Sequence, residues 1–143
     1  MTQGAPLPLD ELYRDLILEH YRKPRNHGTL PAPTHRLEGV NPTCGDEIRL
    51  DVEMDGDTIK AAAFEGQGCA ISQASASMMT ETVVGLDTAA AKAIATDFRA
   101  MLVEGAEPTE RIGDLESLQG VAKFHGRVKC ALLGWEVLKG AMG

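Results

Sequence analysis

Hydrophobic residues near the N-terminus recur at spacings of three and four, which is typical of an amphipathic helix. The positions with this spacing are Leu9, Leu12, Tyr13, Leu16, Ile17 and His20. Pro24 cannot continue a helix, and basic residues precede it, so we expect the helix to end there. Residues 26–34 are rich in turn-forming residues, which predicts a loop before the next element.

The stretch from His35 to Gly68 has the character of strands, because apolar and charged residues alternate within it. The apolar positions of the clearest alternation are Ile48, Leu50, Val52 and Met54. The sequence Asp55-Gly56-Asp57 indicates a tight hairpin turn, and a return strand is expected over Thr58–Phe64. Together with the segment before Asn41, these strands predict a small antiparallel sheet of about three strands.

The remainder of the chain predicts helices. A segment rich in Ala, Ser and Met favours a helix over Ala70–Val84, and a second helix is expected over Thr88–Val103. Residues 113–124 indicate a short helix and a connection, and a last amphipathic helix begins near Gly126. With no internal repeat or linker, residues 1–143 predict one α+β domain in which the sheet packs against several helices.

The charge balance narrows the classes of partner. Fourteen Lys and Arg against 21 Asp and Glu give a net charge of −7, which argues against a nucleic-acid partner. No apolar run approaches the roughly 20 residues that cross a bilayer, and Met1–Leu9 do not have the pattern of a secretion signal. We therefore expect a cytoplasmic protein without a membrane partner.

Three cysteines are an odd number, which argues against a closed disulfide framework in such a chain. Buried structural thiols, a catalytic thiol and metal ligands remain as interpretations. Cys44 lies in a predicted turn between strands, Cys69 precedes a predicted helix, and Cys130 is expected in the first turn of the last helix. Helix N-termini and nearby cations stabilise thiolates, so Cys69 and Cys130 are expected in settings that lower a thiol pKa.

Cys44 and Asp46 are two positions apart, and in an extended chain such side chains point the same way and can hold one ion. Three thiolates and a carboxylate suit tetrahedral Zn²⁺, and sulfur ligands also suit iron–sulfur chemistry. The separations of 25 and 61 positions differ from the close cysteine pairs of zinc fingers. On spacing alone, scattered cysteines are more often buried core thiols than ligands.

Four motifs, in order along nearly the whole chain, change this balance. They are Tyr21–Asn26, Asn41–Asp46, Gly66–Ser72 and Arg127–Ala131. Together they resemble the IscU/NifU N-terminal scaffold family, and within it the SufU branch. The long segment Gly85–Gly126 is similar to that branch, and Lys129 stands where IscU-type scaffolds carry a histidine before the third cysteine.

The resemblance implies that the sheet and helices bring the metal ligands together at one exposed end. The ligands it implies are Cys44, Asp46, Cys69 and Cys130. The implied function is that of a zinc-bound acceptor of persulfide sulfur from a SufS-type cysteine desulfurase, serving downstream SUF assembly proteins. Cys44 is the implied sulfur acceptor. Arg127 is either a cation at a helix end or a partner of Asp46 during ligand exchange, and His125, where relatives have proline, is a surface residue or an alternative ligand.

Other functions stay open at this point. The same residues can assemble and transfer a [2Fe–2S] cluster, as in an IscU-type scaffold. A metal-independent thiol enzyme would use Cys44 or Cys69 as nucleophile with a histidine base, although none of the four histidines has a recognisable catalytic context. Gly66-Gln67-Gly68 hints at nucleotide binding, but Ile71 stands where the fingerprint has a third glycine. A purely structural zinc site is a further alternative.

Overall fold

The computed structural model describes residues 11–143, and side chains from Tyr13 onward; the predicted helix positions Leu9 and Leu12 lie outside these described parts. In chain order the elements are α1 (Glu11–Arg22), β1 (His35–Asn41), β2 (Asp46–Asp55), β3 (Thr58–Gln67), α2 (Ala70–Val83), α3 (Thr88–Arg99), the π-helical turn η1 (Ala100–Glu104), the 3₁₀ segment η2 (Glu110–Lys123) and α4 (His125–Met142). The prediction of an α+β fold with a three-stranded antiparallel sheet is confirmed.

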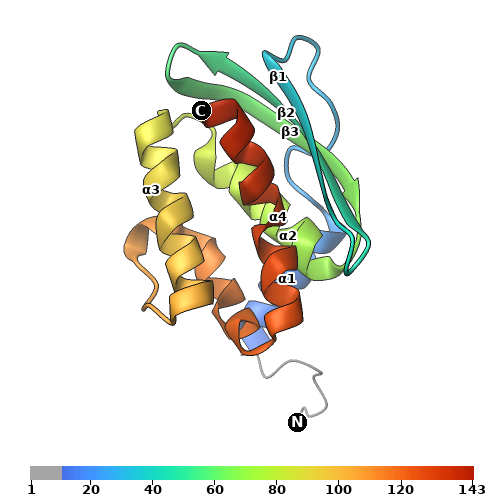
Figure 1. The fold of residues 1–143 in the computed structure, drawn as a ribbon, viewed down its shortest axis with the longest axis vertical. Coiled ribbons are helices and arrows are strands. Elements are labelled where there is room, and N and C mark those ends of the chain that lie inside the picture. The colour runs from blue at the N-terminus through green and yellow to red at the C-terminus, as the bar shows by residue number, and fades with distance from the viewer. Residues whose placement is uncertain (1–10) are drawn as a thin grey trace.

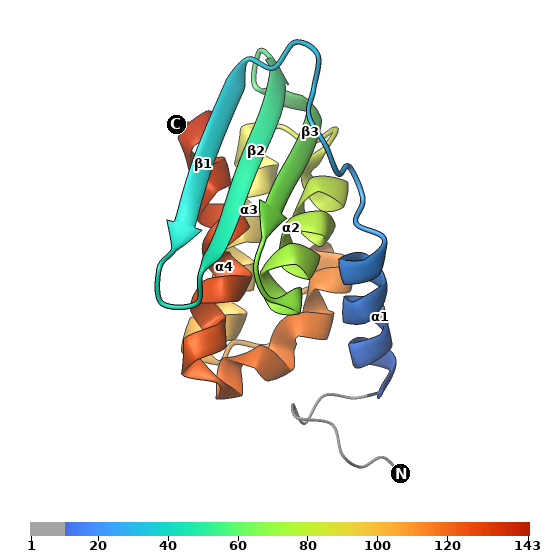
Figure 2. The same ribbon diagram turned by 90° about the vertical axis from the view of Figure 1, so that its right-hand side faces the viewer.

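The strands lie in the order β1-β2-β3, and all neighbours are antiparallel. One face of the sheet is covered by helices, with α4 packed on β1 and β2 and α2 packed beneath β3 (Figures 1 and 2). The alternating residues Ile48, Leu50 and Val52 are all buried in this layer, as their pattern predicts. The strand pairing opposes Asn41 to Asp46 across the β1–β2 turn.

Helix α2 lies at the centre of the molecule, and every residue from Ile71 to Thr80 is buried. Its small side chains let α4 approach closely, since a Cβ added at Gly134 would lie 3.4 Å from the Ala76 side chain. The Ser75 hydroxyl donates a 2.6 Å hydrogen bond to the Ala131 carbonyl, which satisfies a buried polar group between the two helices. This close packing fixes the N-terminal end of α2 beside the N-terminal half of α4.

Three predicted boundaries differ from the structure. Strand β3 continues past Phe64 to Gln67, because its last residues pair with the start of β2. Helix α3 ends at Arg99, and the chain widens into the π-helical turn η1, which Gly105 ends with a left-handed φ of 72°. In place of a short helix, η2 is a 3₁₀ segment broken at Gly113. In the part of the chain that the structure describes, no helix has the length and apolar character needed to cross a membrane.

Candidate metal centre

The β1–β2 turn presents the first cysteine to solvent. The backbone N–H groups of Cys44 and Gly45 both donate to the Asn41 carbonyl, at 3.2 and 2.8 Å. Gly45 has a φ of 75°, a left-handed conformation that glycine adopts without the steric cost of a side chain. The turn therefore holds the Cys44 thiol in an exposed position at the end of the sheet.

Asp46 begins β2 and is fully buried. Its Oδ1 accepts a 2.9 Å hydrogen bond from the backbone N–H of Cys69. This approach needs glycine at position 68, because a Cβ there would lie 2.1 Å from Oδ1 and φ is +143°. Among the described residues, Asp46 Oδ2 has no hydrogen-bond partner although it is buried. An unpaired buried carboxylate oxygen is costly, so a positively charged ligand would satisfy it.

Cys130 brings a third possible ligand atom close to those of Cys44 and Asp46. Its Sγ lies 3.4 Å from Cys44 Sγ and 3.8 Å from the Asn41 side-chain amide. One ligand atom from each of Cys44, Asp46 and Cys130 lies within 4.8 Å of the other two. Soft sulfur and a carboxylate at such separations are the donors that Zn²⁺ takes, so these residues fit that metal. Figure 2 shows the start of α2, the β1–β2 turn and the first turns of α4 at one end of the molecule.

The expectation of a lowered pKa at Cys130 is wrong. Cys130 is the sixth residue of α4, in its second turn, and it is completely buried. Burial raises the pKa of its thiol, and the neighbouring side chains of Asp46 and Cys44 raise it further. The helix N-terminus is therefore outweighed, in the metal-free protein, by the loss of solvation of the charged form.

Cys69 precedes α2 as its N-cap residue and is half-buried beside the group of three, without belonging to it. It is close enough to Cys130 to raise the pKa of that thiol. The Arg127 guanidinium also faces Cys69, and a hydrogen bond and charge interaction with this thiol raise the pKa of Arg127, with smaller contributions from Cys130 and Cys44. Arg127 thus lies at the thiols, and its pairing with Asp46 stays a prediction.

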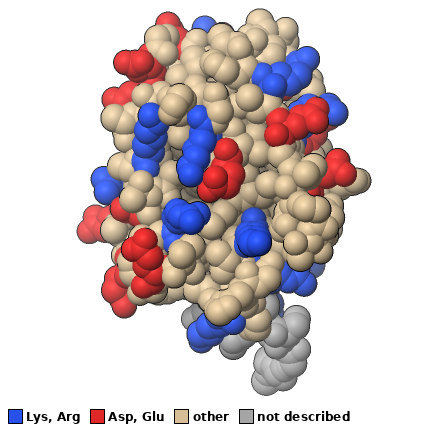
Figure 3. Space-filling view, viewed as in Figure 1, with Lys and Arg blue, Asp and Glu red and all other residues tan. Residues whose placement is uncertain are grey.

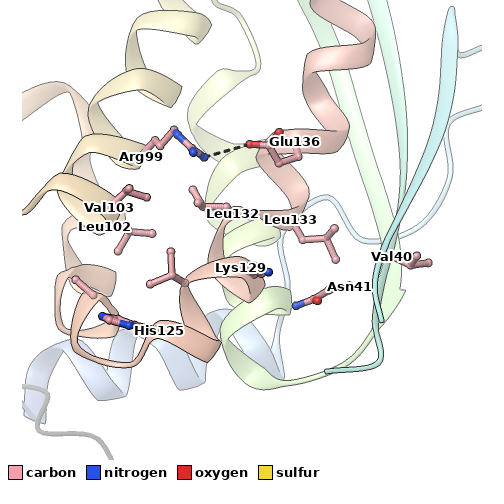
Figure 4. A pocket seen from close by; sticks show the side chains of 12 residues that line it. Val40, Asn41, Arg99, Leu102, Val103, His125, Lys129, Leu132, Leu133 and Glu136 are labelled. Carbon is pink, nitrogen blue, oxygen red and sulfur yellow. Dashed lines mark ion pairs between the residues drawn. The ribbon is translucent and has the colours of Figure 1, made fainter. Parts of the chain in front are cut away.

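The other candidate residues have different settings. His125 is exposed, lines a groove next to the site and is not part of the group of three (Figure 4). Glycine is required at positions 66 and 68 for structural reasons. A Cβ at Gly66 would lie 2.2 Å from the Glu47 carbonyl oxygen, and the absence of a side chain at Gly68 makes room for Asp46. The hint of nucleotide binding therefore has a simpler explanation in sheet geometry.

Two features were missed from the sequence. Asn41 is buried with its amide against Cys130, and its only sequence signal is its place just before the Pro-Thr-Cys-Gly-Asp turn. A second group joins His20, Glu81 and Asp114, whose ligand atoms lie within 4.8 Å of one another. There Arg25 forms an ion pair with Glu81 at 3.8 Å, so a cation already serves this carboxylate.

The sheet, its layer of helices and the thiols gathered at one end define a small α+β domain with a candidate thiol-rich metal site. The model of the NifU-like N terminal domain matches residues 12–141, and the chain belongs to that family. Its relatives include proteins of the SufU branch, as the sequence motifs predict.

Two characterised relatives cover most of the chain. The zinc-dependent sulfurtransferase SufU of Bacillus subtilis is 48% identical over 133 residues, which cover 92% of this chain and 89% of that protein. The iron-sulfur cluster assembly scaffold protein IscU of Streptococcus pyogenes is 42% identical over 135 residues, 94% of this chain and 84% of that protein. The chain is thus similar to proteins of both kinds.

Solved structures share the fold. A putative iron-sulfur cluster assembly scaffold protein for the SUF system from Fervidobacterium islandicum has a TM-score of 0.84 and 35% identity, over 90% of this chain and 95% of that one. A nitrogen-fixing NifU-like protein (N-terminal) from Brucella abortus has a TM-score of 0.85 and 25% identity, over 92% of each chain.

Proposed function

We propose that this chain is a zinc-bound sulfur acceptor of iron–sulfur cluster assembly that takes persulfide sulfur from a SufS-type cysteine desulfurase. The observation that carries the proposal is the pairing of an exposed thiol, Cys44, with a buried group of Asp46 and Cys130 at 4.8 Å or less. An exposed thiol can meet a protein donor, whereas buried ligands can hold a metal. The similarity to the Bacillus subtilis zinc-dependent sulfurtransferase supports the same choice.

Four residues would hold the metal in this proposal: Cys44, Asp46, Cys69 and Cys130. The unpaired Asp46 Oδ2 suits a cation, because a buried carboxylate oxygen without a partner is unfavourable, and the 3.4 Å distance between the Cys44 and Cys130 sulfur atoms brings two soft donors together. Bound zinc would keep the thiols deprotonated and would link the β1–β2 turn and the start of β2 to the N-terminal ends of α2 and α4. A metal that binds the folded chain in this way would also raise its stability.

The chemistry belongs to Cys44. Its thiolate attacks the outer sulfur of the donor's cysteine persulfide, so a new S–S bond forms on Cys44 while the donor's S–S bond breaks. The electron pair of the broken bond leaves with the donor cysteine as a thiolate, and no outside oxidant or reductant is needed. Cys130, completely buried, is poorly placed for this attack. Arg127 lies beside the thiols. It could form an ion pair with Asp46 when Cys44 separates from the other ligands in order to react.

Elemental analysis of the purified protein and its Asp46→Ala and Cys130→Ser variants tests the proposal. We expect about one zinc per chain, its loss in both variants, and faster sulfur release by a cysteine desulfurase only with the zinc-loaded protein. Cys44→Ser should abolish sulfur acceptance. A Cys44→Ser protein that accepts sulfur at the normal rate, or a wild-type protein without metal, would refute the proposal.

The second candidate is a scaffold on which a [2Fe–2S] cluster is assembled and passed to other SUF proteins. The similarity to the Streptococcus pyogenes scaffold protein IscU favours it, and the same thiols suit iron–sulfur ligation. Iron with acid-labile sulfide, and visible absorbance that zinc does not give, would select this function. Sulfur transfer that persists after complete metal removal would instead select a metal-independent thiol enzyme. A cytoplasmic location accompanies either assembly role.

A further inference from the structure

A groove of about 710 Å³ lies on the face formed by α3, η1 and α4, next to the thiol site (Figure 4). Most of its lining side chains are apolar, and they include Leu102, Val103, Val128, Leu132 and Leu133. Water in contact with such a surface is unfavourable, so the groove is suited to an apolar side chain from another molecule.

Val103 marks the outer wall of this groove. It is 51% exposed, one of four large hydrophobic residues that the described chain leaves exposed. Its side chain points from η1 toward α4, whereas that of Val40 points away from the helices (Figure 4). Leu102, its neighbour in sequence, is buried at 3% exposure and forms part of the groove lining. Val103 therefore offers apolar area that the fold itself does not cover.

The charged side chains around the groove are mainly basic, although the whole chain has a net charge of −7. On this face, lysine and arginine side chains gather over α3 and α4, while most acidic side chains lie toward its edges (Figure 3). Arg99 pairs with Glu136 at 3.6 Å. Lys129 has no ion pair among the described residues, although it is exposed at the groove. A carboxylate on the occupant would complement this ammonium group.

The groove and the thiol site share residues. Asn41 lines the groove and also places its side-chain amide 3.8 Å from Cys130 Sγ. Lys129 directly precedes Cys130 in α4. A segment seated in the groove would thus lie beside the cysteines, where a protein that exchanges sulfur with Cys44 has to be held.

We propose that this groove is the docking site for a segment of the sulfur donor that carries an apolar side chain next to a carboxylate. The apolar side chain covers Val103, and the carboxylate pairs with Lys129. The inference rests on the proposed function, because it takes the cysteine desulfurase as the occupant. It adds the surface and the chemistry by which that partner is recognised.

Binding of the zinc-loaded full chain to the desulfurase, measured by isothermal titration calorimetry, tests the groove. We expect Val103→Asp and Lys129→Glu each to weaken binding roughly tenfold, the range of a central interface residue. Lys129→Gln should weaken it less than Lys129→Glu, and the Lys129 effect should shrink as salt rises. Val84→Asp is the matched control, because Val84 is also exposed, at 37%, but lies outside the groove. Unchanged zinc content and circular dichroism establish that each variant is folded.

The outcomes separate the groove from the function. If the wild type binds the desulfurase and Val103→Asp and Lys129→Glu bind it with the same dissociation constant, the docking site is overturned and the proposed function still stands. No wild-type binding and no sulfur transfer would overturn both. If Val103→Asp abolishes self-association in analytical ultracentrifugation but leaves desulfurase binding intact, the occupant is a second copy, and the proposal fails. Selective weakening by the groove variants supports it.

Discussion

The backbone N–H of Cys69 donates a 2.9 Å hydrogen bond to Asp46 Oδ1, and this bond ties the start of α2 to the start of β2. The other carboxylate oxygen, Oδ2, is buried without a partner among the described residues. One side chain thus has two separable tasks. Oδ1 orders the backbone around Cys69, and Oδ2 is available to a metal.

Asp46→Asn and Asp46→Ala should separate these tasks. An asparagine keeps an oxygen for the Cys69 N–H but replaces Oδ2 with an amide that does not bind zinc. We expect Asp46→Asn to lose zinc affinity with little change in the stability of the metal-free protein. Asp46→Ala should also destabilise the metal-free protein by about 1–3 kcal/mol, because a buried N–H loses its acceptor. Chelator competition and urea unfolding measure the two effects.

Asp51→Asn is the control for Asp46. Asp51 is also a buried carboxylate of β2, but its oxygens accept hydrogen bonds from Arg36 at 2.9 and 3.1 Å. The substitution should lower stability and leave zinc affinity unchanged. Equal zinc affinity in Asp46→Asn and the wild type would remove Asp46 from the ligand set.

Gly68→Ala should damage the site more than another glycine substitution at positive φ. An added Cβ would lie 2.1 Å from Asp46 Oδ1, whereas at Gly56, with φ +62°, nothing lies within 4 Å. Gly56→Ala should cost about 1 kcal/mol of stability from backbone strain alone. Gly68→Ala should cost about 1–3 kcal/mol more, because Asp46 has to move, and should lower zinc affinity. Urea unfolding of both metal-free variants checks this, and equal losses would contradict it.

Alkylation of the metal-free, reduced protein should rank the three thiols. Cys44 is exposed, Cys69 is half-buried and Cys130 is buried, and burial raises the pKa of Cys130. We expect Cys44 to react roughly tenfold or more faster than Cys130, with Cys69 between them. Peptide mass spectrometry after iodoacetamide treatment gives the rate at each cysteine.

Two controls interpret the alkylation rates. In denaturing urea the three rates should converge, because burial no longer differs between the cysteines. Zinc should protect all three thiols if all three are ligands. A Cys130 that reacts as fast as Cys44 in the folded, metal-free protein would contradict the burial seen here.

The sequence patterns predicted the strands, the helices α2 and α4 and the family, because these depend on local periodicity and on short motifs. They could not predict that Cys130 is buried, since its solvation depends on how closely α4 packs on α2 through Gly134 and Ala76. The groove likewise depends on η1 between α3 and α4, and the π geometry of η1 has no clear periodic signal. The predicted ligands Cys44, Asp46 and Cys130 meet because the sheet register and this helix packing act together.

His20 should make the stability of the fold depend on pH. It is 1% exposed, and its Nδ1 lies 2.7 Å from the Ser77 hydroxyl. Burial is the main cause that lowers its pKa from the ordinary value of 6.5; Arg25 lowers it further, and the carboxylates Glu81, Asp114 and Glu19 oppose the shift. Below pH 6.5 the unfolded chain therefore binds a proton that the folded chain does not yet bind.

The contribution of His20 is thus fully present above pH 6.5 and is lost as the pH falls from there toward the lowered pKa. We expect the wild type to lose more stability than His20→Gln when the pH falls from 7.5 to 5.5. At pH 7.5 itself, His20→Gln should be about 1 kcal/mol less stable than the wild type, because its contact with Ser77 changes. Urea unfolding with a chelator present at each pH excludes proton-driven metal loss. His125→Gln, at an exposed histidine, should keep the wild-type slope. Parallel slopes for wild type and His20→Gln would show that His20 titrates alike in the folded and unfolded chains.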